Sequence, residues 1–251
     1  MKVTALKTPL VKKGDDLLKI ISQSLEAVPE KSVLVVTSKI VTVCQGQMVS
    51  KIMPKHELVR KEADLYLDPK ESIHGMMITV KGHTLAVNAG IDESNANGHF
   101  LLLPRNLQKT TNQIWQFLRE QYGVKEVGVI VTDSRSFPLR WGVLGTCLSH
   151  CGFRALFDRR GEKDLFGREI KETLVNVAEA LAVAGVFQMG EVAEQTPLAL
   201  IKEIGSIKFQ DREPSKQELQ SLKLTLENDI YGPILTRASW QKGSGGYEET
   251  S

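Results

Sequence analysis

The stretch VGVIVTDS, residues 127–134, begins as an apolar, largely β-branched run and ends in an acid and a hydroxyl. Such a run predicts a buried strand of the parallel type, covered on both faces. The run SVLVVT, residues 32–37, predicts a second strand of the same kind. Ligands in open α/β sheets collect at the carboxyl ends of strands, so Asp133 and Ser134 are candidates to face a ligand.

Asp133 and Ser134 offer the hard oxygen ligands that Mg²⁺ and Mn²⁺ prefer. The alternative is that the pair caps a following helix. Phe137-Pro138 comes soon afterwards and argues against a helix starting there. The pair lacks a histidine partner for a nucleophilic triad.

The rest of the chain predicts helices and strands without strict βαβ alternation, which indicates an α+β fold. Helical patterns cover residues 14–28, 55–67, 107–122 and 168–187, and Ser215 with Glu218 forms a capping box for one more helix. A hairpin is expected from 77–80 and 84–87, and a late strand at 198–201. We expect residues 1–240 to form one catalytic unit, undivided or in two subdomains, followed by a flexible tail over 241–251.

Composition excludes several classes of protein. The chain has 251 residues, 41% of them hydrophobic and 25% charged, which are globular proportions. A net charge of +2 gives no electrostatic case for a nucleic-acid partner. No apolar run approaches the roughly 20 residues that span a bilayer, and the N-terminus lacks the apolar core of a signal peptide. We therefore expect a soluble cytoplasmic protein with no membrane partner.

Three cysteines are an odd number, which fits reduced thiols better than a disulfide framework. Cys147, His150 and Cys151 are spaced like part of a zinc site, but no partner cluster matches them. Reduced core cysteines are the favoured interpretation. The chain also lacks a GxxxxGK[ST] phosphate loop, a strand-anchored GxGxxG and a GxSxG elbow.

Three further segments carry polar groups in unusual settings. In VNAGIDESN, residues 87–95, Asp92 and Asn95 follow a glycine turn and could face the same ligand. In MGEVAEQTP, residues 189–197, Gly190 is a helix stop that leaves Glu191 beside an open turn. The alternative for the first segment is a polar turn bonded to its own backbone, and for the second an ordinary helix–strand connection.

The third segment joins RWG at 140–142 to the charged run at 158–168. Arginine forks match phosphate and carboxylate geometry, and glycines let backbone N–H groups approach an anion. Arg140, Asp164 and Arg168 are the candidate catalytic residues. The alternative is a solvated loop with internal ion pairs.

Together and in this order, these segments resemble the coenzyme F-420-0:γ-glutamyl ligase family. The matching stretches are TPLVKKGDDL (8–17), SVLVVTSKIV (32–41), VNAGIDESN (87–95), GVIVTDS (128–134), RWG (140–142), GEKDLFGRE (161–169) and MGEVAEQTP (189–197). PLRWG, DLFGRE, MGEVAEQTPLALI, the C-terminal ENDIYGPIL and Trp240 resemble the folate-metabolism γ-glutamate ligase branch of that family.

The resemblance implies an intertwined homodimer with a family-specific α+β fold. It implies a ligase that uses GTP (or ATP) and two divalent cations, Mg²⁺ or Mn²⁺. Such an enzyme joins L-glutamate through its amine to an acceptor carboxylate, here a folate or, as the alternative, F-420-0. The implied metal ligands are Asp92, Asp133, Ser134 and Glu191. The implied nucleotide-binding residues are Thr8, Pro9, Leu10, Val11, Thr37, Ser38, Lys39, Asn95, Met189, Gly190, Val192, Ala193, Glu194, Gln195 and Thr196.

One stretch departs from the family pattern. Where the family often has Ser-Lys-Ala-Glu-Gly, this chain has TVCQG at residues 42–46, so Val43 replaces a lysine and Gln45 an acid. Lys39 could restore the charge if an alternating strand turned it to the same side. A nucleotide-binding homologue that has lost ligase activity, and a metal-dependent phosphohydrolase, therefore stay open as alternatives to the ligase.

Overall fold

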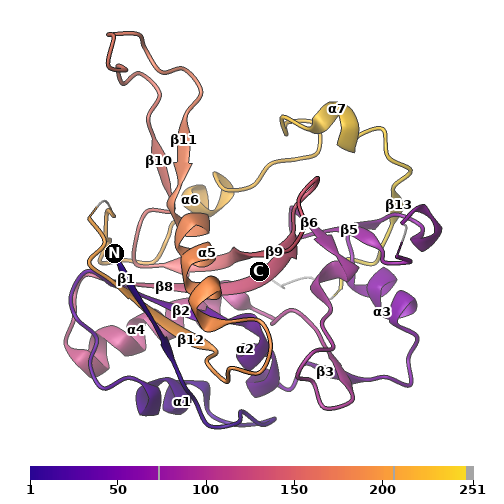
Figure 1. Cartoon of the computed structure of the whole chain (residues 1–251), viewed down its shortest axis with the longest axis horizontal. Helices are drawn as coiled ribbons and strands as arrows, with labels where there is room; N and C mark the ends of the chain where they lie inside the picture. The colour runs from indigo at the N-terminus through magenta and orange to yellow at the C-terminus, as the bar shows by residue number, and fades with distance from the viewer. Residues whose placement is uncertain (73, 206, 247–251) are drawn as a thin grey trace.

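A five-stranded sheet forms the centre of the protein, described here from a computed structural model that covers residues 1–72, 74–205 and 207–246 (Figure 1). Its strand order is β1 (Lys2–Leu6), β12 (Leu198–Lys202), β2 (Ser32–Thr37), β8 (Val127–Ser136) and β9 (Val143–Cys151). β2 and β8 are parallel, and the other neighbours are antiparallel. The two predicted buried strands are confirmed, and the structure pairs them in parallel.

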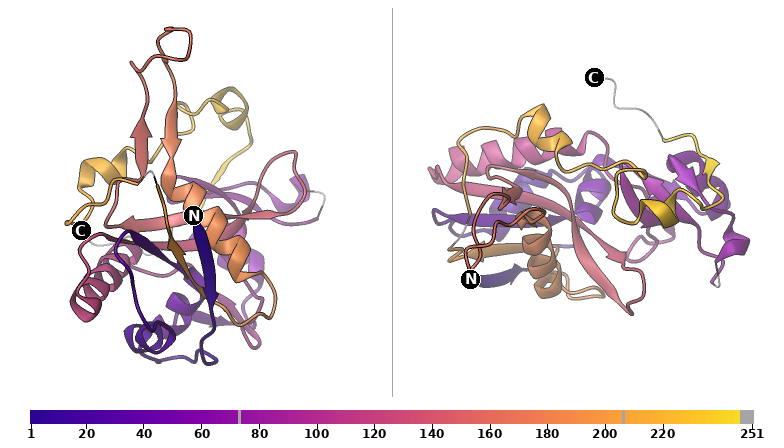
Figure 2. Two further views of the ribbon diagram at one scale, coloured as in Figure 1. Left: turned by 60° about the vertical axis from the view of Figure 1, so that its left-hand side comes forward. Right: turned by 90° about the horizontal axis from the view of Figure 1, so that it is seen from above.

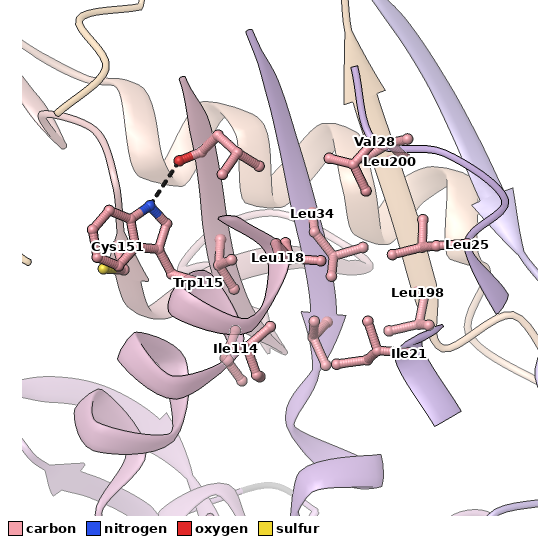
Figure 3. Packing of buried hydrophobic residues seen from close by; sticks show 14 of the residues in the cluster. Ile21, Leu25, Val28, Leu34, Ile114, Trp115, Leu118, Cys151, Leu198 and Leu200 are labelled. Carbon is pink, nitrogen blue, oxygen red and sulfur yellow. Dashed lines mark hydrogen bonds between the residues drawn. The ribbon is translucent and has the colours of Figure 1, made fainter. Parts of the chain in front are cut away.

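Helices cover both faces of this sheet, which explains why its two central strands are apolar without alternation. On one face, α1 (Leu17–Ser24), α2 (Ser38–Gln45) and α4 (Leu107–Tyr122) pack around Leu34 and Val129. Figure 3 shows this cluster, in which the indole N–H of Trp115 donates to the carbonyl oxygen of Val127 at 3.0 Å. On the other face, α5 (Val177–Met189) covers Val35 and Ile130.

A smaller sheet and a short ladder lie beside the central sheet. The smaller sheet has the order β13 (Gln241–Lys242), β4 (Leu65–Tyr66), β5 (Ile78–Lys81) and β6 (Thr84–Val87). β3 (Met48–Ser50) pairs with β7 (His99–Leu101), and α3 (Lys55–Glu62) packs on a third apolar cluster containing Met77 and Phe100. The hairpin predicted near residues 77–87 is confirmed as β5–β6, and the fold is α+β as expected.

The C-terminal segment is hydrogen-bonded over most of its described length. The capping box is confirmed, because Glu218 N–H donates to the Ser215 hydroxyl and Ser215 N–H donates to the Glu218 carboxylate before α6 (Lys216–Gln220). After α7 (Gly232–Leu235), residues 241–246 do not form the expected flexible tail: β13 pairs with β4, and Gly243 N–H donates to the Asp64 carbonyl. Residues 247–251 lie outside the described residues.

Three predicted helices have different limits in the structure. The helix predicted at 14–28 spans only Leu17–Ser24, with the carboxylate of Asp16 as its N-cap, and the one predicted at 55–67 ends at Glu62. The helix predicted at 168–187 is α5 and begins at Val177. Residues before it belong to a hairpin of β10 (Leu156–Asp158) and β11 (Leu174–Asn176), where Ile170 N–H donates to the Glu162 carbonyl. Local strand-like pairing therefore overrides the helical propensity of that charged run.

Two hairpins project from the body of the protein, as Figures 1 and 2 show for β10–β11. The other is the β8–β9 hairpin, because β8 does not end at Asp133 but runs on to Ser136 beside β9. The hairpin tips expose large apolar side chains: Leu139, Trp141, Leu165 and Phe166 are each at least 95% exposed. Within the described part of the chain, no helix is both long and apolar enough to cross a bilayer.

Candidate active site

A cavity of about 360 Å³ opens at the carboxyl ends of the parallel strands β2 and β8. Its wall comes from segments that are far apart in the sequence. The predicted residues that line it are Thr8, Pro9, Leu10, Val11, Thr37, Lys39, Asn95, Asp133, Ser134, Met189, Gly190, Glu191, Val192, Ala193, Glu194, Gln195 and Thr196. The structure thus gathers most of the candidate metal-binding and nucleotide-binding residues around one hollow.

The first wall is the turn from β2 into α2. Thr37 ends the strand and is the N-cap of the helix, and its side chain makes no capping hydrogen bond. Because residues 38–45 are a helix and not an alternating strand, Lys39 and Val43 are one turn apart on the same face, and both line the cavity. Ser38 is buried behind this wall. A helix N-terminus at this position favours phosphate binding.

The second wall is the turn from Asp92 to Asn95, of which Asn95 lines the cavity and Asp92 does not. Asp92 Oδ1 accepts the N–H groups of Glu93 and Ser94, so the polar turn does bond to its own backbone. Asp92 Oδ2 accepts from the Lys39 ammonium at 2.7 Å and from the Ser94 hydroxyl at 3.0 Å. Backbone bonding and ligand-facing geometry, the two alternatives drawn from the sequence, therefore coexist in this turn.

Asp133 and Glu191 complete an acidic cluster. The Ser134 hydroxyl donates to Glu191 Oε1 at 2.8 Å, which joins β8 to the turn after α5. Burial raises the pKa of the Asp133 carboxyl to about 6, and the charges of Asp92 and Glu191 act in the same direction. Burial would also raise the pKa of Asp92, but hydrogen bonds from Lys39 and Ser94 outweigh it and hold that pKa below its ordinary value.

The third wall is the loop at 189–197. Gly190 has φ +81° and ψ 172°, a conformation essentially restricted to glycine, and a Cβ there would lie 2.4 Å from the Glu194 carboxyl carbon. The Asn95 amide donates to the Val192 carbonyl at 2.7 Å. The Gln195 amide donates to the Thr8 carbonyl at 2.8 Å. The loop is therefore tied both to the Asp92 turn and to the segment that follows the N-terminal strand.

The remaining acid and arginine candidates lie elsewhere in the single chain. Arg140 donates to the Leu139 carbonyl at the tip of the β8–β9 hairpin. Asp164 accepts the N–H groups of Phe166 and Arg168 within the β10–β11 hairpin. None of the three predicted catalytic residues lines the cavity of its own chain, because each sits on a projecting hairpin. Their catalytic role stays a prediction.

The two departures from the family pattern have different settings. Val43 lines the cavity, so its lost charge is a change within the site. Gln45 lies outside the cavity lining and links α2 to the start of α4: its side chain accepts from Arg105 N–H and donates to the Arg105 carbonyl and the Thr110 hydroxyl. The neutral amide suits this donor-and-acceptor role better than a carboxylate would.

The alternative zinc cluster does not form in the structure. The three cysteines are free, and burial lowers the pKa of His150, which packs edge-on against Phe153, to about 4. Across the described residues, no three His, Cys, Asp or Glu side chains stand in a ready metal-ligand arrangement. In the acidic cluster, Lys39 covers an oxygen of Asp92 and Ser134 one of Glu191.

Sequence reasoning missed Arg135, two residues beyond Asp133 on β8. Its guanidinium lies 5.1 Å from the Phe137 ring and 3.8 Å from the Glu179 carboxylate. Among the described residues, Arg135 Nε is the one buried side-chain nitrogen or oxygen without a hydrogen-bond partner. The signal would have been the continuation of the strand to Ser136, but the apolar run that predicted the strand stops before Asp133.

Comparisons with known proteins point to one family. A family model described as F420-0:Gamma-glutamyl ligase matches residues 5–203. The coenzyme F420:L-glutamate ligase of Methanopyrus kandleri is 36% identical over 209 residues, which is 76% of this chain and 82% of the relative. The enzymes of the same name from Methanothermobacter thermautotrophicus and Methanocaldococcus jannaschii are 33% and 31% identical, over 77% and 80% of this chain and 85% and 87% of the relatives.

Proposed function

The chain belongs to the F420-0:γ-glutamyl ligase family and is a γ-glutamyl ligase, and from this premise we propose that it couples cleavage of a nucleoside triphosphate to the joining of L-glutamate with an acceptor carboxylate. A carboxylate does not form an amide with an amine at neutral pH unless it is activated. Transfer of the terminal phosphoryl group gives an acyl phosphate. The glutamate amine attacks the acyl carbon, phosphate leaves, and the amine loses its proton.

The observation that carries this proposal is the acidic cluster beside a helix N-terminus. Two anions must meet in this chemistry, the terminal phosphate and the acceptor carboxylate. Asp92, Asp133, Ser134 and Glu191 present only oxygen atoms, and this donor set fits Mg²⁺ or Mn²⁺. These residues would hold two divalent cations, which supply charge neutralisation when bound.

The nucleotide is proposed to lie between α2 and the 189–197 loop. Thr37 and the first turn of α2 offer N–H groups to phosphates, and Thr8 to Val11 with the loop enclose the rest of the molecule. Either GTP or ATP fits this description. We place GTP first because the family resemblance favours it.

The acceptor is proposed to be F420-0. The sequence motifs favour a folate, but the relatives at 31–36% identity are named for coenzyme F420 and L-glutamate. These relatives support the deazaflavin acceptor over the folate. A folate is retained as the second substrate to be tested.

The experiment that tests the proposed function is release of inorganic phosphate by the purified protein. We expect release with GTP and Mg²⁺ that requires both L-glutamate and F420-0, and that is slower with a folate. Nucleotide binding without turnover on any acceptor would indicate a homologue that has lost ligase activity. Hydrolysis of the nucleotide at a rate independent of glutamate would indicate a phosphohydrolase.

We further propose that the two projecting hairpins join two copies of the chain into a homodimer. Leu165 is 99% and Phe166 95% exposed at the tip of the β10–β11 hairpin, and Trp141 is 98% exposed on the β8–β9 hairpin. Large apolar side chains gathered on such projections indicate a protein interface. The partner's cavity is then a place where Arg140, Asp164 or Arg168 can act.

Changing Leu165 and Phe166 together to serine is expected to convert the dimer into a monomer. Two buried large apolar side chains per copy would be lost from the interface, roughly 3–6 kcal/mol per copy. Light scattering coupled to size-exclusion chromatography measures the mass. Ile52→Ser is the matched control, because Ile52 is 93% exposed on the body of the protein. A wild-type monomer, or a double variant that stays dimeric, would contradict the interface.

A further inference from the structure

Lys39 is the only basic side chain among the described residues that line the cavity. Its Nζ lies 2.7 Å from Asp92 Oδ2 and 2.7 Å from the Ser94 hydroxyl oxygen. Its side chain is 27% exposed, and that of Asp92 34%. The single ammonium of Lys39 thus faces the three carboxylates of Asp92, Asp133 and Glu191. It forms a direct ion pair with Asp92.

The position of this ammonium conflicts with a cation on Asp92. Mg²⁺ contacts its oxygen ligands directly, at about 2.0–2.1 Å, and the ammonium already covers Oδ2. Both N–H groups of the turn occupy Oδ1. Two like charges cannot share Oδ2, so a cation that binds there must displace Lys39.

Once displaced from Asp92, the Lys39 side chain would lie next to the N-terminus of α2. Lys39 is the second residue of α2, beside the free N–H groups of the helix N-terminus, and its four-carbon stem is flexible. Val43, one turn further along the same face, carries no charge. Lys39 is therefore the one described basic side chain of the cavity wall that can reach a phosphate at the helix N-terminus.

We propose that Lys39 is a built-in counter-ion: it neutralises the acidic cluster before the metals bind, is displaced from Asp92 by the incoming divalent cation, and then binds a nucleotide phosphate. This inference rests on the proposed function and deepens it. A merely structural Lys39 would instead be a fixed link between α2 and the Asp92 turn. The two roles predict different signs for the effect of removing the charge.

The test is Mn²⁺ affinity without nucleotide, measured by electron paramagnetic resonance, for the wild type and Lys39→Met. Loss of the competing ammonium is expected to tighten Mn²⁺ binding about tenfold or more. In the same variant, GTP affinity measured at saturating Mn²⁺ is expected to fall about tenfold, because the phosphate contact made by the displaced ammonium is lost. Lys39→Arg, which keeps the charge, should keep both affinities within about threefold of the wild type.

Lys55→Met is the matched control. Lys55 pairs at 2.9 Å with Glu93, the neighbour of Asp92, but does not line the cavity, so both affinities should be unchanged. Weaker or unchanged Mn²⁺ binding by Lys39→Met would overturn the proposal. Lys39→Gln provides the same comparison if the Met variant fails to fold, as judged by circular dichroism.

The counter-ion inference and the ligase function fail in different ways. If the wild type ligates glutamate but Lys39→Met shows no gain in Mn²⁺ affinity, the counter-ion role is wrong and the ligase stands. If Mn²⁺ binding tightens and GTP binding weakens as expected but no acceptor gives product, the counter-ion role stands and the ligase function fails.

Discussion

Replacing Asp133 with asparagine is expected to lower the rate of glutamate ligation about 1000-fold, while making the metal-free protein more stable at pH 7. The loss of rate follows if this carboxylate holds a cation at the centre of the cluster. The gain in stability follows from the raised pKa of Asp133, which is about 6 in the folded protein. The carboxylate that is proposed to hold a cation thus destabilises the fold without metal.

The raised pKa of Asp133 determines whether the free energy of unfolding rises or falls with pH. In the unfolded chain, the Asp133 pKa returns to about 3.9. Between pH 4 and 6 the folded state therefore binds more protons than the unfolded state, and stability falls as the pH rises through this window. Above it the cost is full, about 2–3 kcal/mol for a shift of this size.

Thermal unfolding in EDTA from pH 4 to pH 8 measures this cost directly. Asp133→Asn should match the wild type near pH 4 and exceed it at pH 7. Asp164→Asn, on the β10–β11 hairpin, is a control that should show no gain at pH 7, since it lies outside the acidic cluster. A less stable Asp133→Asn at pH 7, or a rate within tenfold of the wild type, would refute this account of Asp133.

Replacing Gly190 with alanine is expected to weaken nucleotide binding about 100-fold. The backbone at Gly190 has φ +81°, and the new Cβ would lie 2.4 Å from the Glu194 carboxyl carbon. Strain of this kind costs about 1–3 kcal/mol, and Glu194 must also release the Val192 N–H that it accepts. The loop that carries Glu191 and contacts Asn95 would then shift. Titration calorimetry with GTP and Mg²⁺ measures the affinity.

Gly123→Ala is the control that separates the effect of backbone strain alone from the effect of strain at the cavity wall. Gly123 ends α4 with φ +66°, has open space around the Cβ position, and does not line the cavity. We expect it to lose about 1 kcal/mol of stability and keep full GTP affinity. If Gly190→Ala behaves like Gly123→Ala, then the 189–197 loop does not form the nucleotide site.

Sequence patterns were sufficient to predict the strands that are buried on both faces and the helix that is buried on one face. β2 and β8 are buried on both faces, so their apolar runs had one good interpretation, and α4 had a single apolar stripe ending in a glycine. α5 was misplaced because it is apolar nearly all round, so that periodicity did not show where it began. The hairpin at 156–176 depends on ladder pairing, which residue types alone do not reveal.

The candidate site likewise contains residues that the sequence predicted and contacts that it did not. Polar residues at the end of a buried apolar run, such as Asp133, were found because the change from apolar to polar residues is visible in the sequence, although β8 itself continues to Ser136. The Lys39–Asp92 contact joins residues 53 positions apart in sequence, and Lys39 makes it from the first turn of the helix α2. Lys39 and Val43 were expected on an alternating strand, but they lie on a helix, where they still share the face that lines the cavity. The proposed contact of the hairpin tips with a partner copy depends on assembly, which no pattern within one chain encodes.

The most direct test of the central claim is a crystal structure of the protein with Mn²⁺ and a non-hydrolysable GTP analogue, with anomalous scattering recorded to locate the metal. We expect two Mn²⁺ ions bound by the oxygens of Asp92, Asp133, Ser134 and Glu191, phosphates at the start of α2, and Lys39 moved from Asp92 to a phosphate. A nucleotide bound elsewhere, or an intact Lys39–Asp92 pair with no Mn²⁺ at the acidic cluster, would contradict the account.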